Sequence, residues 1–307
     1  MYVCKGLTYS PPPPPTNSLL RSRIINSPPS IQGNEKEVGR GISASGLSRS
    51  DLWITSKLWN TAHRPSNVRP ALEKTLSGLG VEYLDLYLMH WPVAFDPTKS
   101  PSSSSGDSGP VLDKHVSILD TWAAMEDLVR ANLTRFIGIS NFAKGDVEKV
   151  LRNCSIKPAA HEFETHPYLQ QQDFVDWHSS EGVGIPVIAY SPLANMNSIY
   201  KTKIPPIVED PFFVGLAEEK NATPAQVILS WGIQRGTVVI PKSVHKEWIE
   251  ENLEAETVPL TLDEMERIAG RDKRARFNNP SKSWGVHLFE HLDGAAPEKE
   301  DEYKDLL

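Results

Sequence analysis

The chain has 307 residues, 39 acidic and 32 basic side chains, a formal net charge of −7 and two cysteines. This length suits one large α/β domain, and a negative charge without a basic stripe argues against a nucleic-acid partner. No apolar run approaches the roughly 18 residues of a membrane-spanning helix. Cys4 and Cys154 form no metal or redox motif, so we expect a cytoplasmic protein without a membrane partner.

The first 33 residues differ from the rest. They contain five consecutive prolines (11–15), Pro28-Pro29 and many serines, with no acidic residue before Glu35. Such a composition predicts a disordered tail over 1–33, followed by one folded domain over 34–307. A proline-motif ligand for an adaptor domain is the alternative interpretation of the tail.

From Asn34 onwards, helical patterns alternate with short β-rich runs. In chain order the pattern predicts a helix over 34–46, a strand over 52–57, a helix over 65–79, a strand over 83–92 and a helix over 114–132. Two βα units follow, with strands over 136–141 and 159–166 and a helix after each. The chain then continues with a strand over 187–191, a helix over 224–234, a strand over 238–243, and helices from about 246 and 261. Residues 96–110 and 277–307 look irregular, whereas Ile118, Trp122, Met125 and Val129 have the helical spacing of a core-facing stripe. The alternation is typical of βα units around a parallel sheet.

Nearly every predicted strand ends on polar residues. Because α/β barrels carry their chemistry at the carboxyl ends of the strands, these residues form a candidate site on one rim. Lysine can depress a neighbouring pKa and histidine can donate to a carbonyl oxygen; taken singly, each is equally well explained as a structural strand end. The strand-end residues are Lys57, His90, Ser140, Asn141, His166, Tyr190, Ser191, Lys242 and Ser243.

Other motifs are less informative. His161 and His166 are five residues apart, whereas the zinc-protease pattern needs histidines four apart on a helix, and on a strand this spacing points them to opposite faces. We therefore expect no metal. Lys242 and Ser243 before a helix suit a phosphate, with a solvated lysine as the alternative. There is no Gly-x-Gly-x-x-Gly motif.

Seven short motifs, in order, resemble the aldo-keto reductase family, and in particular fungal aldehyde and sugar reductases. The resemblance runs from Gly33 to about Phe289. The motifs are Gly-Asn-Glu-Lys-Glu-Val-Gly (33–39), Thr-Ser-Lys-Leu-Trp-Asn (55–60), Leu-Asp-Leu-Tyr-Leu-Met-His-Trp-Pro (84–92), Ile-Gly-Ile-Ser-Asn-Phe (137–142), Glu-Thr-His-Pro-Tyr-Leu (164–169), Ala-Tyr-Ser-Pro-Leu (189–193) and Ile-Pro-Lys-Ser-Val (240–244).

The resemblance implies a (β/α)8 TIM-type barrel that reduces aldehydes or ketones with NADPH, or with NADH, and without a metal. In the family a tyrosine protonates the carbonyl oxygen. Lys57 would lower the pKa of that tyrosine, and His90 would orient the carbonyl. The implied partner is a small carbonyl substrate, and the implied oligomeric state is a monomer.

The resemblance also implies a set of binding residues. Ser140, Asn141 and Glu162 would contact the nicotinamide carboxamide, and Tyr190 would stack under the ring. The remaining cofactor residues would be Ser191 and Leu193 at the pyrophosphate, Lys242 and Ser243 at the 2′-phosphate, and Trp248, Glu251 and Asn252 at the adenine. Val244, the last residue of its motif, is also expected to bind the cofactor. Trp59, Trp91 and Trp284 would line an apolar substrate pocket.

Departures from the family pattern affect the proton donor and the cofactor. Gln32 stands where the catalytic tyrosine is expected, and Ser27 where its aspartate is expected. Glutamine is no general acid near pH 7, and serine supplies no fixed charge. Glu162 replaces the usual glutamine. Trp248 replaces an arginine, which weakens the case for NADP over NAD although Lys242 remains.

The family's first two strands and first helix are expected before Gly33, where this chain has its proline-rich tail. A barrel without them would expose two sheet edges. We therefore expect a truncated or mis-spliced N-terminus, which reading the transcript upstream of Gly33 would test. Two alternatives to a working reductase stay open: a non-catalytic module that binds a nucleotide or a protein, and a misfolded fragment.

Overall fold

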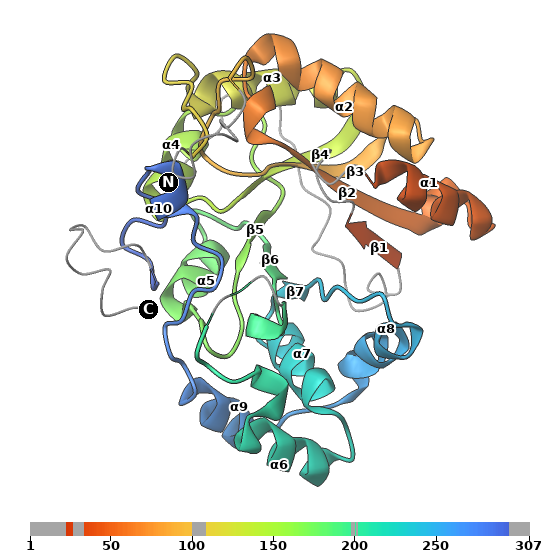
Figure 1. Cartoon of the computed structure of the whole chain (residues 1–307), viewed down its shortest axis with the longest axis vertical. Helices are drawn as coiled ribbons and strands as arrows, with labels where there is room; N and C mark the ends of the chain where they lie inside the picture. Colours follow the sequence, from red (N-terminus) through yellow and green to blue (C-terminus); the bar gives the residue numbers. More distant parts are fainter. Residues whose placement is uncertain (1–22, 27–33, 100–108, 198–199, 201, 295–307) are drawn as a thin grey trace. The chain divides into compact units, whose positions relative to one another are not determined.

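The computed structural model describes residues 23–26, 34–99, 109–197, 200 and 202–294, with only the backbone of 23–26 (Figure 1). The chain folds into two compact units, unit 1 over Met1–His161 and unit 2 over Glu162–Leu307. Most of the expected 96–110 loop, and the 1–33 tail apart from four residues, lie outside the described residues. None of the described helices has the length and apolar character needed to cross a membrane.

Unit 1 is built on parallel strands. They are β1 (Arg23–Asn26), β2 (Leu52–Leu58), β3 (Leu84–Met89) and β4 (Thr134–Ser140), each paired with the next. Every residue of β3 is buried, as the apolar run predicts.

The composition of residues 1–33 predicts disorder throughout, but Arg23–Asn26 within this stretch form strand β1. Its four residues pair in register with Leu52–Thr55 of β2. A four-residue strand beside proline-rich sequence is too short to show a two-residue period, and its hydrogen bonds come from a strand almost thirty positions further on.

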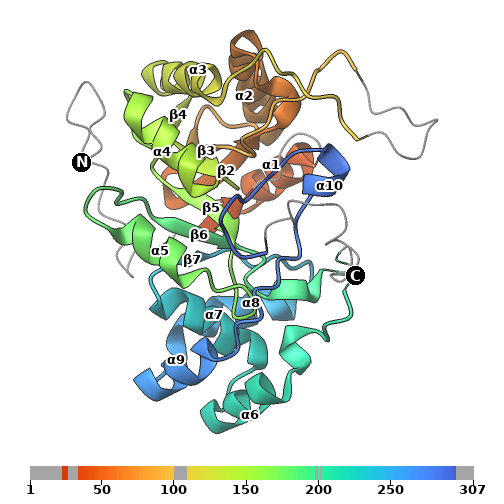
Figure 2. The ribbon, with the colours of Figure 1, turned by 90° about the vertical axis from the view of Figure 1, so that its left-hand side faces the viewer.

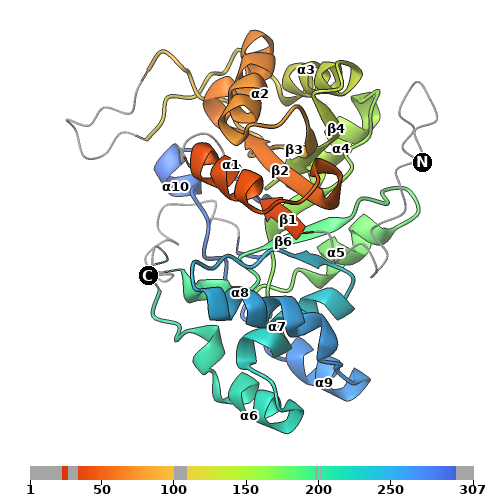
Figure 3. The ribbon, with the colours of Figure 1, turned by 90° about the vertical axis from the view of Figure 1, so that its right-hand side faces the viewer.

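Helices of unit 1 pack in chain order: α1 (Glu35–Ala44), α2 (Pro65–Leu79), α3 (Ile118–Arg130) and α4 (Lys144–Asn153). Neighbouring helices contact one another, α2 also contacts β2, and α3 contacts β4 (Figures 2 and 3). Helix α2 has the bounds that its sequence predicts, with Pro65 in its first turn and Gly80 in the left-handed conformation after its end. On α3, Trp122 and Met125 are buried as predicted.

One buried carboxylate joins three strands of unit 1 at their amino ends. Asp85 of β3 is 1% exposed and accepts the Ile54 N–H of β2 at 2.8 Å. Arg49, just before β2, approaches it at 2.7 Å, and Arg135 of β4 at 3.2 Å. The charge is therefore both paired and hydrogen-bonded, as burial requires.

Unit 2 continues the alternation. Its strands are β5 (His161–Glu164), which begins at the last residue of unit 1, β6 (Val187–Tyr190) and β7 (Val238–Val239), the last two paired in parallel. Its helices are α5 (Gln172–Ser179), α6 (Pro211–Lys220), α7 (Pro224–Gln234), α8 (Lys246–Leu253), α9 (Leu262–Ala269) and α10 (Ser281–Trp284). All six predicted strands occur, whereas α6 was not predicted and α10 lies in a stretch expected to be irregular.

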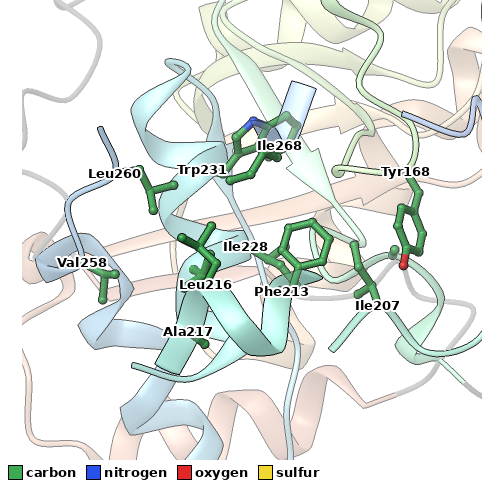
Figure 4. Close-up of a cluster of buried hydrophobic side chains, with 12 residues drawn as sticks. Tyr168, Ile207, Phe213, Leu216, Ala217, Ile228, Trp231, Val258, Leu260 and Ile268 are labelled. Carbon is green, nitrogen blue, oxygen red and sulfur yellow. The ribbon is translucent and has the colours of Figure 1, made fainter. Parts of the chain in front are cut away.

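Helices α6 and α7 contribute half of the buried residues of an apolar core in unit 2 (Figure 4). Asp210 caps α6 by accepting the Phe212 N–H at 2.9 Å, and Thr223 and Gln226 form a capping box on α7. The buried residues of this core are Tyr168, Ala194, Ile207, Phe213, Leu216, Ala217, Val227, Ile228, Trp231, Val258, Leu260 and Ile268.

The packing around β4 in unit 1 can be tested at Gly138. A Cβ atom there would meet the Ala160 carbonyl oxygen and Leu88 Cδ2, each at 2.6 Å, whereas a Cβ on Gly145 in α4 would meet nothing within 4 Å. We expect Gly138→Ala to lower the free energy of unfolding by about 2 kcal/mol, and the control Gly145→Ala to raise it by about 0.5 kcal/mol. Urea denaturation measures both; equal effects would contradict the close approach at Gly138.

Candidate active site

Lys57 and His90 lie at the carboxyl ends of adjacent strands in unit 1. Lys57 in β2 pairs with Leu88 of β3, and His90 directly follows β3, with its N–H donating to the Leu58 carbonyl at 3.1 Å. Lys57 is 6% exposed, and His90 is partly exposed. Parallel pairing thus brings the two side chains to the same edge of the sheet.

The next strand adds two polar residues at this edge. Ser140 ends β4, and Asn141 follows it in the left-handed conformation with φ of 62°, which asparagine tolerates better than most residues. The Asn141 amide donates to the His90 carbonyl and to the Ser140 hydroxyl, both at 3.0 Å. Asn141 therefore joins the ends of β3 and β4, and the His90 N–H joins β3 to the end of β2.

The His90 imidazole is held neutral. Burial lowers its pKa well below the ordinary histidine value, and the charge of Lys57 and the neighbouring His63 lower it further. A neutral imidazole has one N–H donor and one acceptor nitrogen, so His90 can donate a hydrogen bond to a carbonyl oxygen while Lys57 supplies the positive charge.

Aromatic rings surround His90. Trp59 meets it edge-on at 5.1 Å between ring centroids, and Trp91 stacks on it at 6.0 Å. Phe95 extends the cluster, 6.2 Å from Trp59. Trp59 is partly exposed and Trp91 is 3% exposed, so of these two predicted substrate residues Trp59 presents more surface.

Two buried polar residues beside this cluster were missed by the sequence analysis. Asn60, in the short helix Asn60–Ala62, is fully buried, and neither its side-chain oxygen nor its nitrogen has a hydrogen-bond partner among the described residues. The same is true of the Nε2 atom of His63, whose pKa burial lowers to about 3. The signal was available, because both residues directly follow the Lys57 strand.

Tyr190 is the centre of the second group of predicted residues, in unit 2. It ends β6, is partly exposed, and accepts a hydrogen bond from the Asn278 amide at 3.2 Å. Burial and the nearby Glu164 raise the pKa of the Tyr190 hydroxyl well above 10, so the side chain is a neutral phenol. The next residue, Ser191, shares a 2.8 Å hydrogen bond with Tyr200.

The segment before α8 carries the predicted phosphate residues. Lys242 is exposed, Ser243 accepts the His245 N–H at 3.1 Å, and no side chain caps the α8 N-terminus among the described residues. Free helix amides beside an exposed lysine fit a phosphate group, so the residues present suit a phosphorylated nucleotide. Tyr190 offers a neutral ring face of the kind that a nicotinamide stacks on.

The remaining predicted residues are distributed as follows. Glu162 lies in β5 and is 3% exposed, Leu193 is partly buried against the α6–α7 core, and Trp284 ends α10 and is partly exposed. Val244 is 75% and Trp248 55% exposed. Glu251 accepts the Thr223 hydroxyl, Asn252 lies partly exposed on α8, and Gln32 and Ser27 are outside the described residues.

His161 and His166 make separate contacts. His161 Nε2 accepts the Phe142 N–H at 3.1 Å, and His166 Nε2 lies 3.1 Å from the Glu164 carboxylate. The described residues contain no group of three or more histidine, cysteine, aspartate or glutamate side chains arranged to hold a metal ion.

Comparison with known proteins identifies the chain's relatives. The model of the Aldo/keto reductase family matches residues 30–273. An uncharacterized oxidoreductase of Schizosaccharomyces pombe is 44% identical over 255 residues, which cover 82% of this chain and 78% of the relative. The NADPH-dependent D-xylose reductase of Meyerozyma guilliermondii is 40% identical over 262 residues, covering 81% and 82%.

Solved structures agree with these sequence matches. The aldose reductase from Schistosoma japonicum matches with a TM-score of 0.78 and 33% identity, covering 94% of this chain and 93% of that one. The aldose reductase from Giardia lamblia matches with a TM-score of 0.78 and 35% identity, covering 88% and 90%.

The fold and these matches define an oxidoreductase of the TIM-type α/β class. The chain belongs to the aldo/keto reductase family. The resemblance inferred from the seven motifs is confirmed.

The neutral state of His63 has a measurable consequence. The pKa of His63 is about 3 when folded and about 6.5 when unfolded, so below pH 6.5 the unfolded chain binds a proton that the folded chain does not. Stability therefore falls as pH is lowered, by about 2 kcal/mol from this residue between pH 7.5 and 5. We expect His63→Leu to reduce the pH-dependent loss by that amount in urea denaturation; identical losses would contradict the burial of His63.

Proposed function

We propose that this chain reduces aldehydes and ketones to alcohols with a hydride from NADPH, NADH being the alternative donor. The observation that carries the proposal is the neutral His90 beside the buried Lys57 at adjacent strand ends. The name of the xylose reductase relative supports NADPH and a sugar or other small carbonyl compound as substrate. We further propose a monomeric cytoplasmic enzyme.

The chemistry assigned to this chain's residues is electrostatic. His90 donates its N–H to the carbonyl oxygen, which orients the carbonyl and polarises it. Lys57 places a positive charge where negative charge develops on that oxygen. Trp59, Trp91 and Trp284 would limit the water around the reacting carbonyl, which strengthens both interactions. The bound nicotinamide would supply the hydride.

Cofactor binding is assigned to polar strand ends and to α8. Ser140 and Asn141 have amide and hydroxyl groups for a carboxamide, and Glu162 can accept from its NH2 group. Tyr190 would stack on the nicotinamide ring. The further contacts proposed are Ser191 and Leu193 with the pyrophosphate, Lys242 and Ser243 with the 2′-phosphate, and Trp248, Glu251 and Asn252 with the adenine, with Val244 as a neighbouring cofactor residue.

We expect the chain to bind the cofactor but to turn over its substrate slowly. By the family resemblance, Gln32 and Ser27 stand at the tyrosine and aspartate positions, so we propose that the alkoxide formed by hydride transfer takes its proton from solvent water, more slowly than from the family's tyrosine. A purely nucleotide-binding module would share the cofactor contacts and show no turnover at all.

An NADPH titration followed by tryptophan fluorescence tests binding, and NADPH consumption with an aldehyde tests turnover. We expect saturable quenching and slow turnover. Lys57→Met should lower kcat about 100-fold, because one charge aimed at the developing oxyanion is lost. Lys149→Met, at an exposed lysine of α4, is the matched control and should leave kcat unchanged. Quenching without turnover would instead favour the non-catalytic module, and absence of quenching would reject both functions.

Trp248 tests the choice between the two nicotinamide cofactors. Restoring a charge with Trp248→Arg should tighten NADPH binding about tenfold while leaving NADH binding unchanged, because only NADPH carries the 2′-phosphate. Ile249→Arg adds the same charge to the next exposed position of α8 and serves as the control. Equal gains in both variants would indicate general attraction of an anion rather than a contact at position 248.

A further inference from the structure

Within unit 2, successive hydrogen bonds join the last turn of α9 and the segment after it to the segment that follows β5. The Tyr168 carbonyl accepts the N–H groups of Lys273 and Ala275 at 3.2 and 2.9 Å. Gln170 donates to the Ile268 carbonyl at 2.9 Å, and Gln171 accepts from Arg276 at 2.9 Å. The last contact in this series is made by Glu164.

The contact made by Glu164 differs from the others because its acceptor is a buried carboxylate. It is fully buried, and its two oxygens separately accept the N–H groups of Phe277 and Asn278, at 2.8 and 2.9 Å. His166 lies 3.1 Å from one of the oxygens and stacks on the Phe277 ring at 5.4 Å. Burial alone would raise the pKa of Glu164, but the His166 hydrogen bond, together with Arg276 and the backbone donors, holds it below the usual value.

These contacts extend to Tyr190, the residue proposed to stack on nicotinamide. Asn278, whose N–H Glu164 holds, donates its side-chain amide to the Tyr190 hydroxyl at 3.2 Å. Phe277 also stacks on Tyr200 at 6.0 Å, and Tyr200 shares a hydrogen bond with Ser191. Two routes therefore run from the Glu164 carboxylate to consecutive residues at the end of β6.

We propose that Glu164 is a positioning residue: by fixing the backbone of Phe277 and Asn278 it holds the Tyr190 ring in the orientation that receives the nicotinamide. The inference rests on the proposed function, because it gives Tyr190 its stacking role. It assigns a task to a glutamate that the strand-end pattern left unexplained and that lies more than a hundred residues from Asn278 in sequence.

Glu164→Gln tests the proposal, since the side chain keeps its shape but replaces one acceptor with an NH2 group that faces a backbone donor. We expect the Kd for NADPH to rise about tenfold. The Kd for 2′-phospho-ADP-ribose, which lacks the nicotinamide, should change less than about twofold. A merely structural role would weaken both ligands alike. Amide hydrogen exchange at Phe277 and Asn278 should accelerate in the same variant.

Asn278→Ala leaves the carboxylate in place and removes only the link to Tyr190. It should show the same selective loss, about threefold, and the double variant should be no weaker than Glu164→Gln alone, because the two residues act in series. If Glu164→Gln does not fold, Asn278→Ala decides the question by itself.

Glu264→Gln is the matched control. Glu264 is also a buried glutamate that accepts a backbone N–H, from Thr261 at 2.6 Å, and it pairs with Lys220 at 2.7 Å. Its loss should lower stability without changing either Kd. Unchanged NADPH binding in Glu164→Gln, or equal weakening of both ligands, would overturn the proposal while the unmodified chain still binds NADPH. Failure of the unmodified chain to bind NADPH would overturn the proposed function as well.

Discussion

The position of Lys57 and His90 depends on a contact at the opposite end of their strands, the buried carboxylate of Asp85. It accepts the Ile54 N–H and is paired with Arg49 and Arg135, so it constrains β2, β3 and β4 together. A slip of one residue would leave this charge unpaired and would turn every side chain of the strand to the other face. The geometry of the polar edge, about 17 Å away along β3, is therefore set by an interaction with no part in chemistry.

Local patterns were sufficient to predict most of the elements. The bounds of α2 and α7 follow from proline in the first turn and from clear endings, and β3 follows from a continuous apolar run. Strand β1 could not be found in this way, because the pairing described for its four residues is with β2, far along the chain. Helix α6 was missed for a related reason: apolar residues lie on all sides of it, so it shows no helical stripe.

The residues of the candidate site also fall into those that the sequence pattern can identify and those that it cannot. Residues at strand ends can be found from the sequence, because parallel strands deliver their carboxyl ends to one edge. Asn60 and His63 could have been suspected, since they directly follow such an end. Glu164 could not be interpreted, because its two backbone partners at 277 and 278 come from an irregular segment whose path is fixed by side-chain contacts and not by any periodicity. In the sequence it stood out only as the first residue of the motif over 164–169.

Both groups of polar residues use burial to fix a protonation state. In unit 1, burial and Lys57 keep His90 neutral, so the donor and the positive charge are on different side chains. In unit 2, Glu164 stays ionised because every oxygen has a donor, and its charge helps to keep Tyr190 a neutral phenol. Each arrangement is made by described residues of a single unit. The groups proposed to polarise the carbonyl and to stack on the nicotinamide therefore have their protonation states fixed separately, each by the burial and the charges within its own unit.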